Sequence, residues 1–190
     1  MRRIVFFCGP RGAGKGTLVE AVLRVFPKLE RMLAETTRTP RIGELDGDQY
    51  HFCTEDEFEM MLRLGLIAEW EQIGPEQRSG LSWYELLRHT YAVADVVPRI
   101  ARSSRKTLEK HGGRVLIIGV DAPLEERRKR IKLRQPNLSW EQVDKLIADD
   151  PVDLAMCDDL DHLIHNDCDG NPGLAIRKAS RLIKQFLNGG

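Results

Sequence analysis

A glycine-rich segment that carries one lysine follows the first apolar run of the chain. It reads Gly-Pro-Arg-Gly-Ala-Gly-Lys-Gly-Thr over residues 9–17, directly after the apolar residues 4–8. Glycines let consecutive backbone N–H groups turn toward one anion, and a lysine beside them reaches the outer phosphates. Apolar residues at helical spacing between positions 18 and 26, ended by Pro27, predict a helix whose positive N-terminus adds to this cradle. The sequence therefore predicts a nucleoside triphosphate site between a buried strand and a helix.

We expect the triphosphate to be bound along the whole of this segment. The expected contacts are Gly9, Arg11, Gly12, Ala13, Gly14, Lys15, Gly16 and Thr17. Gly16 stands where a serine or threonine ordinarily ligates magnesium, and the hydroxyl comes one position later. Mg²⁺ is still expected, because the metal neutralises charge on the transferred phosphoryl group. Thr17 is therefore the expected magnesium ligand, either directly or through water.

A second group of residues has the chemistry of a phosphate monoester site. Arg38 and Arg41 stand three apart across a proline, and Tyr50 follows. Each guanidinium can donate two hydrogen bonds to phosphate oxygens, and such charge-assisted contacts contribute roughly 1.5–3 kcal/mol each. The alternative is a solvated loop whose arginines form surface ion pairs with Glu44 and its acidic neighbours.

A third group of cations lies in a basic run over residues 125–134. Arg130 and Arg134 are four apart and share one face of the helix that this run predicts. Phosphoryl transfer needs positive groups near the developing charge more than it needs a strong base, so these arginines are candidates to clamp a triphosphate. The alternative is a solvated basic helix face.

The order of the predicted elements indicates an α/β fold with a parallel sheet flanked by helices. Core strands are expected at residues 4–8, 31–36, 90–97, 114–120 and 163–165, and core helices at 17–26, 98–110 and the C-terminus. A polar stretch at residues 37–49 has the composition of an insertion. A short strand at 50–53, a helix that Thr54 and Glu57 begin with a capping box, a strand at 67–73 and a loop at 74–80 follow it.

Composition limits the class of protein. A chain of 190 residues with 42% hydrophobic residues suits one globular domain. Its 29 basic and 29 acidic residues cancel, so no general attraction to nucleic acid or to an anionic membrane is expected. The apolar runs are too short for a signal peptide or a membrane span, which favours a cytoplasmic protein. The cysteines Cys8, Cys53, Cys157 and Cys168 lack metal-type spacing and are expected to be small packed side chains.

The residues from Thr36 to Phe52, read together with the glycine-rich segment, resemble the guanylate kinase family. That family carries a Thr-Thr-Arg-x-Pro-Arg-x-Gly-Glu-x-x-Gly-x-x-Tyr-x-Phe block at this distance from its phosphate loop, and the resemblance covers most of the chain. It implies a single domain over residues 1–190. In this domain a P-loop kinase core, residues 1–34 and 86–190, would carry an inserted monophosphate-binding subdomain at 35–85 and a lid at 131–145.

The resemblance also implies roles for single residues. Arg38, Arg41 and Tyr50 match the groups that hold the acceptor phosphate, with Glu44 nearby. Glu69 matches a carboxylate that accepts from the guanine N–H edge, and the alternative for it is an outward-facing strand glutamate. The remaining matches are Arg130 and Arg134 in the lid, Lys145 where another arginine is usual, and Asn166 near the donor adenine.

Several positions depart from the family pattern. Ala34 and Glu35 stand where a base-reading serine is usual, and Arg78 and Ser79 stand near the usual tyrosine and hydroxyl. Arg78 is a candidate replacement for the tyrosine as a phosphate donor, and Ser79 for the hydroxyl. Asp95 is the one acidic residue where the family has two, and it fits a magnesium-bound water, a base contact or a strand-end cap.

These observations predict an ATP-dependent nucleoside monophosphate kinase, with GMP or dGMP as the first expected acceptor. Lys15, Arg38, Arg130 and Arg134 are the expected catalytic groups. Three alternatives stay open: a kinase for another nucleotide or a phosphosugar, a non-catalytic protein-binding module, and a nucleotide-switch ATPase. Either a monomer or a homodimer is expected, with no nucleic acid or membrane as partner.

Overall fold

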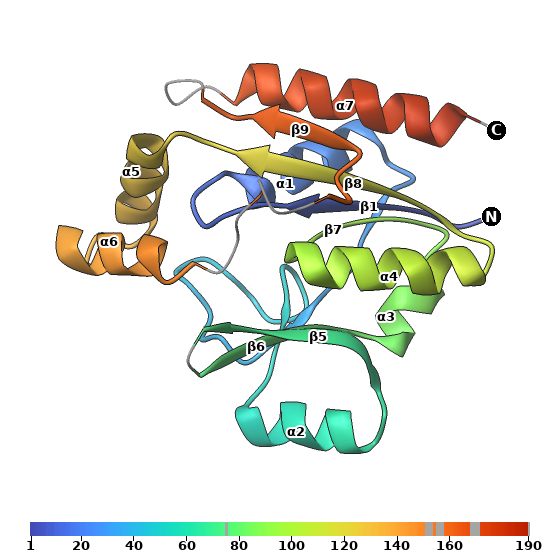
Figure 1. The fold of residues 1–190 in the computed structure, drawn as a ribbon, viewed down its shortest axis with the longest axis horizontal. Coiled ribbons are helices and arrows are strands. Elements are labelled where there is room, and N and C mark those ends of the chain that lie inside the picture. The colour runs from blue at the N-terminus through green and yellow to red at the C-terminus, as the bar shows by residue number, and fades with distance from the viewer. Residues whose placement is uncertain (75, 151–153, 155–157, 168–171, 190) are drawn as a thin grey trace.

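A computed structural model describes residues 1–74, 76–150, 154, 158–167 and 172–189 of the chain (Figure 1). Five parallel strands form the central sheet, in the order β2-β7-β1-β8-β9. These strands are β1 Arg3–Cys8, β2 Glu30–Arg31, β7 Tyr91–Asp95, β8 Arg114–Asp121 and β9 His162–His165. The parallel core expected from the sequence is confirmed.

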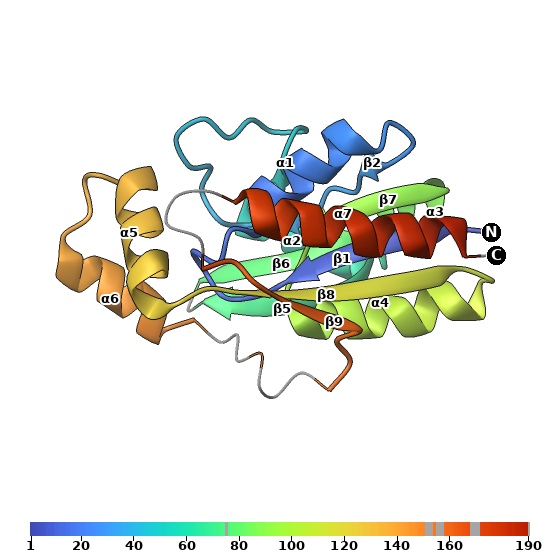
Figure 2. The same cartoon turned by 90° about the horizontal axis from the view of Figure 1, so that it is seen from above.

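Helices cover both faces of this sheet, as Figures 1 and 2 show. The helices of the core are α1 Lys15–Val25, α3 Trp83–Arg88, α4 Pro98–Lys110 and α7 Gly173–Asn188. Alternate residues of β1 point to opposite faces, as in any strand. Val5 and Phe7 pack in one apolar cluster with α1 and α7, whereas Ile4, Phe6 and Cys8 pack in the other, with α4. The central strand is therefore buried on both sides.

The inserted segment forms a second sheet of four strands, in the order β4-β3-β6-β5. Its elements are β3 Glu35–Thr36, β4 His51–Phe52, α2 Glu55–Arg63, β5 Ile67–Gly74 and β6 Gln77–Ser82. The capping box that begins α2 at Thr54 is confirmed. The loop expected at 74–80 is wrong, because residues 77–82 pair with both β5 and β3. The strand expected at 31–36 is likewise divided between β2 and β3.

Two short helices form an outlying part of the molecule, to the left in Figure 1. They are α5 Leu124–Arg134 and α6 Trp140–Ala148, and the capping box expected at Ser139 and Gln142 is confirmed. The residue boundaries expected for the core, the insertion and the lid stay predictions. Cys157 and Cys168 lie outside the described residues. No helix in the described part of the chain has the length and apolar character that crossing a membrane would require.

One buried carboxylate joins the two chain segments that lead into and out of the second sheet. Glu85, in α3 just after β6, is 1% exposed and accepts a hydrogen bond of 2.9 Å from the backbone N–H of Leu33, just before β3. It also accepts from Arg88 at 2.7 Å and lies 3.1 Å from the His89 ring. Burial alone would raise the pKa of Glu85, but its hydrogen bonds with His89, Leu33 and Arg88 lower it to about 2.

We predict that Glu85→Gln destabilises the protein by roughly 3 kcal/mol at neutral pH, because Arg88 and the backbone N–H of Leu33 lose a charged acceptor. The folded pKa of about 2 lies below the ordinary 4.5, so this stability is complete above pH 4.5 and is lost as pH falls toward 2. Urea unfolding should therefore show a difference between variant and wild type that shrinks from pH 6 to pH 3. The exposed Glu109→Gln is the control, and an unchanged difference across this range would contradict the prediction.

Candidate active site

The glycine-rich segment forms a tight turn between β1 and α1. Gly12 and Gly14 have φ of 80° and 97°, a backbone region that residues with a Cβ adopt only with strain. A Cβ on Gly14 would lie 2.3 Å from Nδ2 of Asn166, and one on Gly12 would lie 2.8 Å from the carbonyl oxygen of Arg127. The turn therefore needs glycine both for its backbone conformation and for its close contact with neighbouring elements.

Lys15 is the first residue of α1, and its ammonium group folds back over the turn. Nζ donates to the carbonyl oxygens of Gly9 at 2.6 Å and Pro10 at 3.2 Å. Burial lowers the pKa of Lys15, and the negative charges of Asp95 and Asp150 oppose that effect. The ammonium is thus held inside the cleft by loop carbonyls and faces carboxylates from two other parts of the chain.

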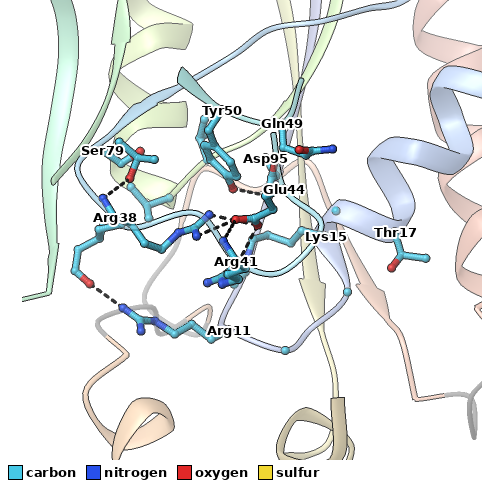
Figure 3. A pocket seen from close by; sticks show the side chains of 18 of the residues that line it. Arg11, Lys15, Thr17, Arg38, Arg41, Glu44, Gln49, Tyr50, Ser79 and Asp95 are labelled. Carbon is cyan, nitrogen blue, oxygen red and sulfur yellow. Dashed lines mark hydrogen bonds and ion pairs between the residues drawn. The ribbon is translucent and has the colours of Figure 1, made fainter. Parts of the chain in front are cut away.

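A cleft of about 440 Å³ lies against this turn. Figure 3 shows side chains from the turn, the inserted segment and the end of β7 converging on it. The predicted site residues that line it are Gly9, Arg11, Gly12, Gly14, Lys15, Gly16, Thr17, Arg38, Arg41, Glu44, Tyr50, Asp95, Arg130 and Arg134. The structure therefore brings the expected donor and acceptor groups to one cavity.

Arg38 and Arg41, the expected acceptor arginines, are held in place by one carboxylate. Arg38 donates to both oxygens of Glu44, at 2.8 and 3.2 Å, and the backbone N–H of Arg41 donates to Glu44 at 2.8 Å. Burial would raise the pKa of Glu44, but these hydrogen bonds lower it. The side chains of Arg38 and Glu44 are 10% and 16% exposed, so the pair is largely buried and the solvated-loop alternative does not describe it.

Positive charge exceeds negative charge around this pair. Burial, together with the nearby positive charges of Arg134 and Arg38, lowers the pKa of Arg41 to about 10. Burial also lowers the pKa of Arg134, with repulsion from Arg38 adding to it and attraction to Glu44 opposing it. Arg38 and Arg41 thus contact the Glu44 carboxylate, and the Arg134 guanidinium is close enough to be influenced by the same charge. Three cations beside one anion favour binding of an added anion.

Tyr50 lies between Arg38 and the end of β7. Its hydroxyl donates to Asp95 at 2.9 Å, and its ring lies 5.2 Å from the Arg38 guanidinium carbon. Burial and the Asp95 charge both raise the pKa of Tyr50, so the phenol stays protonated and remains a donor. Asp95, at the end of β7, therefore lies between the Tyr50 hydroxyl and the Lys15 ammonium (Figure 3).

Arg130 of the basic helix α5 is already bound to the turn. Arg130 donates to the carbonyl oxygen of Ala13 at 3.2 Å and to that of Asn166 at 2.8 Å. Asn166, which is 2% exposed, donates from Nδ2 to Ala13 at 2.8 Å. Neither Ala13 nor Asn166 lines the cleft, and Asn166 stabilises the turn through its hydrogen bond to Ala13. A direct contact of either residue with the donor nucleotide stays a prediction.

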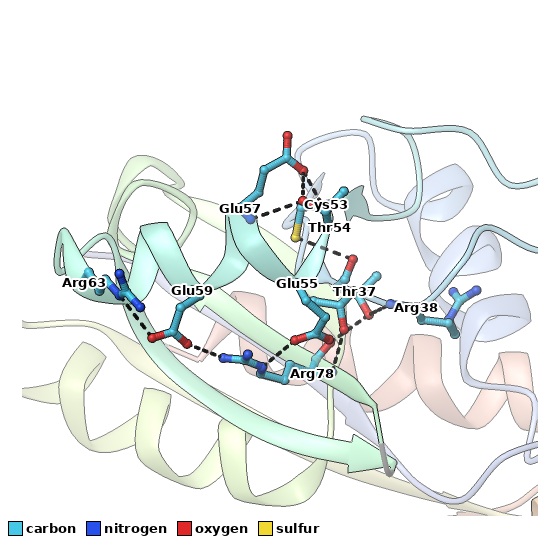
Figure 4. A network of polar contacts seen from close by, with 10 residues as sticks. Thr37, Arg38, Cys53, Thr54, Glu55, Glu57, Glu59, Arg63 and Arg78 are labelled. Carbon is cyan, nitrogen blue, oxygen red and sulfur yellow. Dashed lines mark hydrogen bonds and ion pairs between the residues drawn. The ribbon is translucent and has the colours of Figure 1, made fainter.

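Two predicted substrate residues do not line the cleft. Arg78 donates to Glu55 at 2.8 Å and to Glu59 at 2.9 Å, on the α2 side of the second sheet (Figure 4). Its guanidinium carbon also lies 5.5 Å from the Phe58 ring centroid. Glu69 accepts a 3.3 Å hydrogen bond from Thr107 of α4. Ser79, by contrast, does line the cleft, as the candidate hydroxyl.

Sequence reasoning missed residues that reach the cleft from distant segments. Asp150, just after α6, accepts a hydrogen bond from the backbone N–H of Arg11, and Gln77 of β6 also lines the cleft. Asp150 and Arg11 are 139 positions apart, so no local pattern indicates their contact. Among the residues that the structure describes, no group of three or more His, Cys, Asp or Glu side chains forms a metal cluster.

A glycine turn at the head of a helix, beside a parallel sheet and opposite arginines from an inserted sheet, defines an α/β protein built to bind phosphorylated ligands. The guanylate kinase family model matches residues 1–166. The chain therefore belongs to the guanylate kinase family, whose members are nucleoside monophosphate kinases.

Individual relatives agree with this assignment. The guanylate kinase of Nocardia farcinica is 32% identical over 170 residues, which are 87% of this chain and 86% of the relative. That of Salinibacter ruber is 30% identical over 98% of both chains. The crystal structure of guanylate kinase from Anaplasma phagocytophilum matches with a TM-score of 0.67 at 18% identity, covering 96% of this chain and 85% of that one. This last likeness shows the shared fold.

We predict that Gly14→Ala lowers the affinity for ATP by at least about tenfold, because the new Cβ would displace Asn166 and strain the turn. Calorimetric titration with ATP measures the loss, and circular dichroism checks that the fold persists. Gly112→Ala is the matched control, since Gly112 has a φ of +72° with open space around it. Unchanged ATP affinity in Gly14→Ala would contradict this role of the turn.

Proposed function

We propose that this protein transfers the γ-phosphoryl group of ATP to GMP, and also to dGMP, giving ADP and the nucleoside diphosphate. The observation that carries the proposal is that Lys15 and the Arg38–Arg41 pair face one cleft. The names of the relatives support the acceptor, since several of them are called guanylate kinase.

In this reaction a phosphate oxygen of GMP attacks the γ-phosphorus in line, and the bond to the β-γ bridging oxygen of ATP breaks. Arg38 and Arg41 orient the attacking phosphate, with Tyr50 as a further donor once its hydroxyl turns from Asp95 toward the phosphate. Lys15 and Arg134 stabilise the charge that spreads over the transferred group, and Arg130 assists once it turns from the loop carbonyls toward the phosphates. No covalent intermediate with the protein is needed.

The donor set of the cleft fits a magnesium ion that is bound mainly by phosphate oxygens and water. The Thr17 hydroxyl and the Asp95 carboxylate both line the cleft, and either group can contact such an ion or its water. When bound, Mg²⁺ neutralises phosphate charge.

The two rival classes of function account poorly for the buried cations. A protein-binding module has no need for Lys15 in a glycine turn opposite a guanidinium pair. A switch ATPase needs no second phosphate-binding site.

The described cleft is built by one chain, so a monomer suffices, although a homodimer is compatible with it. ATP and GMP are cytoplasmic metabolites, and neither nucleic acid nor a membrane is required as a partner.

We predict that a coupled ADP-release assay with GMP, dGMP, AMP, UMP, CMP and dTMP gives the highest kcat/KM for the guanine nucleotides. Without an acceptor, ATP hydrolysis should be slow, because a closed cleft excludes water. Lys15→Met should lower kcat by at least about 100-fold, since it removes a charge that the transition state needs. Steady hydrolysis without an acceptor would favour the switch ATPase, and absence of ATP binding would favour the protein-binding module.

Guanine selection is proposed to depend on Glu69, because a fixed carboxylate accepts two N–H donors from guanine and adenine offers no such pair. Glu69 lies outside the described cleft, so this contact would require the second sheet to close on the bound acceptor. The Thr107 contact leaves acceptor capacity on this carboxylate. We predict that Glu69→Gln lowers kcat/KM for GMP by about 10–100-fold and changes that for AMP little. Thr107→Val, which keeps the carboxylate, is the control and should stay near wild type. An equal loss for both nucleotides would contradict base reading by Glu69.

A further inference from the structure

Arg11 lies in the glycine-rich turn, but its side chain leaves the turn and reaches the second sheet. Its guanidinium NH2 donates at 2.9 Å to the carbonyl oxygen of Ile73, near the end of β5. Figure 3 shows Arg11 at the edge of the cleft with this contact drawn. The two residues are 62 positions apart, so the hydrogen bond joins the donor turn directly to the sheet that carries the acceptor arginines.

The backbone of the same residue is bound to the outlying helices. The carbonyl oxygen of Arg11 accepts from Nε of Arg127 in α5 at 2.8 Å, and its N–H donates to Asp150, which follows α6. Arg127 and Asp150 also pair with each other at 3.4 Å, with side chains 14% and 4% exposed. Three different groups of Arg11 therefore contact three parts of the molecule: the second sheet, α5, and the segment after α6.

The chemistry of these contacts suits a structural connection. Carbonyl oxygens are strong acceptors for guanidinium groups. The Asp150 carboxylate accepts a charge-assisted hydrogen bond from the backbone N–H of Arg11. A second, smaller cavity of about 120 Å³ borders Arg11, between the acceptor loop at Thr39 and Pro40 and the helices at Ile131 and Leu146. Arg11 thus lies where these parts meet, beside the groups that would hold the two substrates.

We infer that Arg11 is a positioning residue that couples the placement of the second sheet and of the outlying helices to the donor turn. This inference rests on the proposed function. Binding of the donor orders the turn, and through Arg11 this also orders β5 and the Asp150–Arg127 pair. The acceptor site at Arg38 and Arg41 is then arranged before GMP binds, so each substrate raises the affinity for the other by the same factor.

Calorimetry tests this coupling without turnover. GMP is titrated into the protein with and without a non-hydrolysable ATP analogue and Mg²⁺, and the ratio of the two affinities gives the coupling factor. In wild type we expect the analogue to strengthen GMP binding about tenfold or more. In Arg11→Ala the ratio should fall toward one, because the hydrogen bond to the Ile73 carbonyl is lost. Arg11→Lys, which keeps a donor for the Ile73 carbonyl, should restore part of the coupling.

The opposite result has a definite meaning. If Arg11→Ala weakens binding of the analogue itself and leaves the ratio as in wild type, Arg11 binds phosphate and the inference is wrong. Arg63→Ala, at a side chain 77% exposed on α2, is the control and should keep the full ratio.

A second variant guards against misfolding of Arg11→Ala. Asp150→Asn retains the shape of the side chain but weakens its contacts with Arg11 and Arg127, and it should lower the ratio as well. A wild-type ratio in Asp150→Asn would remove the outlying helices from the coupling and overturn the inference. Failure of the proposed function is distinguishable, since a wild type that does not phosphorylate GMP in the ADP-release assay fails there, whatever the ratio is.

Discussion

The concentration of positive charge in one cleft is the constraint on which the rest of the site depends. Lys15, Arg38, Arg41 and Arg134 lie close enough to influence one another, and burial lowers the pKa of several of them. Like charges in a partly buried site repel, so each cation needs a fixed partner before the substrates arrive. Lys15 is held by loop carbonyls and Arg38 by Glu44, and these partners set where the charges lie.

Rigid neighbours explain why these partners do not move. The loop carbonyls that hold Lys15 belong to a turn that follows the buried β1 strand, and Asn166 and Arg130 brace it at Ala13. The acceptor side is connected to the core through Glu85, which binds the chain before the second sheet, and through Arg11, which binds the end of β5. The distance between donor and acceptor cations is thus controlled by a few hydrogen bonds between the parts and not by the loops alone.

Local signals in the sequence were sufficient for much of this arrangement. The glycine turn before α1 and the capping boxes at Thr54 and Ser139 depend on residues within a few positions of one another, and all were predictable. The β6 strand was not, because residues 77–82 contain arginine, serine and glycine without apolar alternation. It forms by pairing with β3, which is distant in the sequence, and with β5, where the register of the pairing is irregular.

The face on which a side chain lies was the hardest feature to predict. In the hairpin Glu71 pairs with Ser79 and Gln72 pairs with Arg78, so adjacent residues of β6 point to opposite sides of the second sheet. Ser79 consequently lines the cleft, whereas Arg78 binds the glutamates of α2. A one-residue shift in register would exchange them, and only the pairing decides it.

Under the proposed function, the acceptor phosphate and the acceptor base are recognised by different kinds of contact. The phosphate end of the cleft has buried guanidinium groups and the Tyr50 hydroxyl, each a strong donor. Val96 and Val97 also line the cleft, and Val96 packs in an apolar cluster with Ala34 and Leu81. Apolar walls distinguish ligands of similar size by only about 10–200-fold, whereas paired hydrogen bonds to a base distinguish them far more strongly. In the proposed reaction, binding strength therefore comes mainly from the phosphate, and selection of the base depends on the few polar groups that reach it.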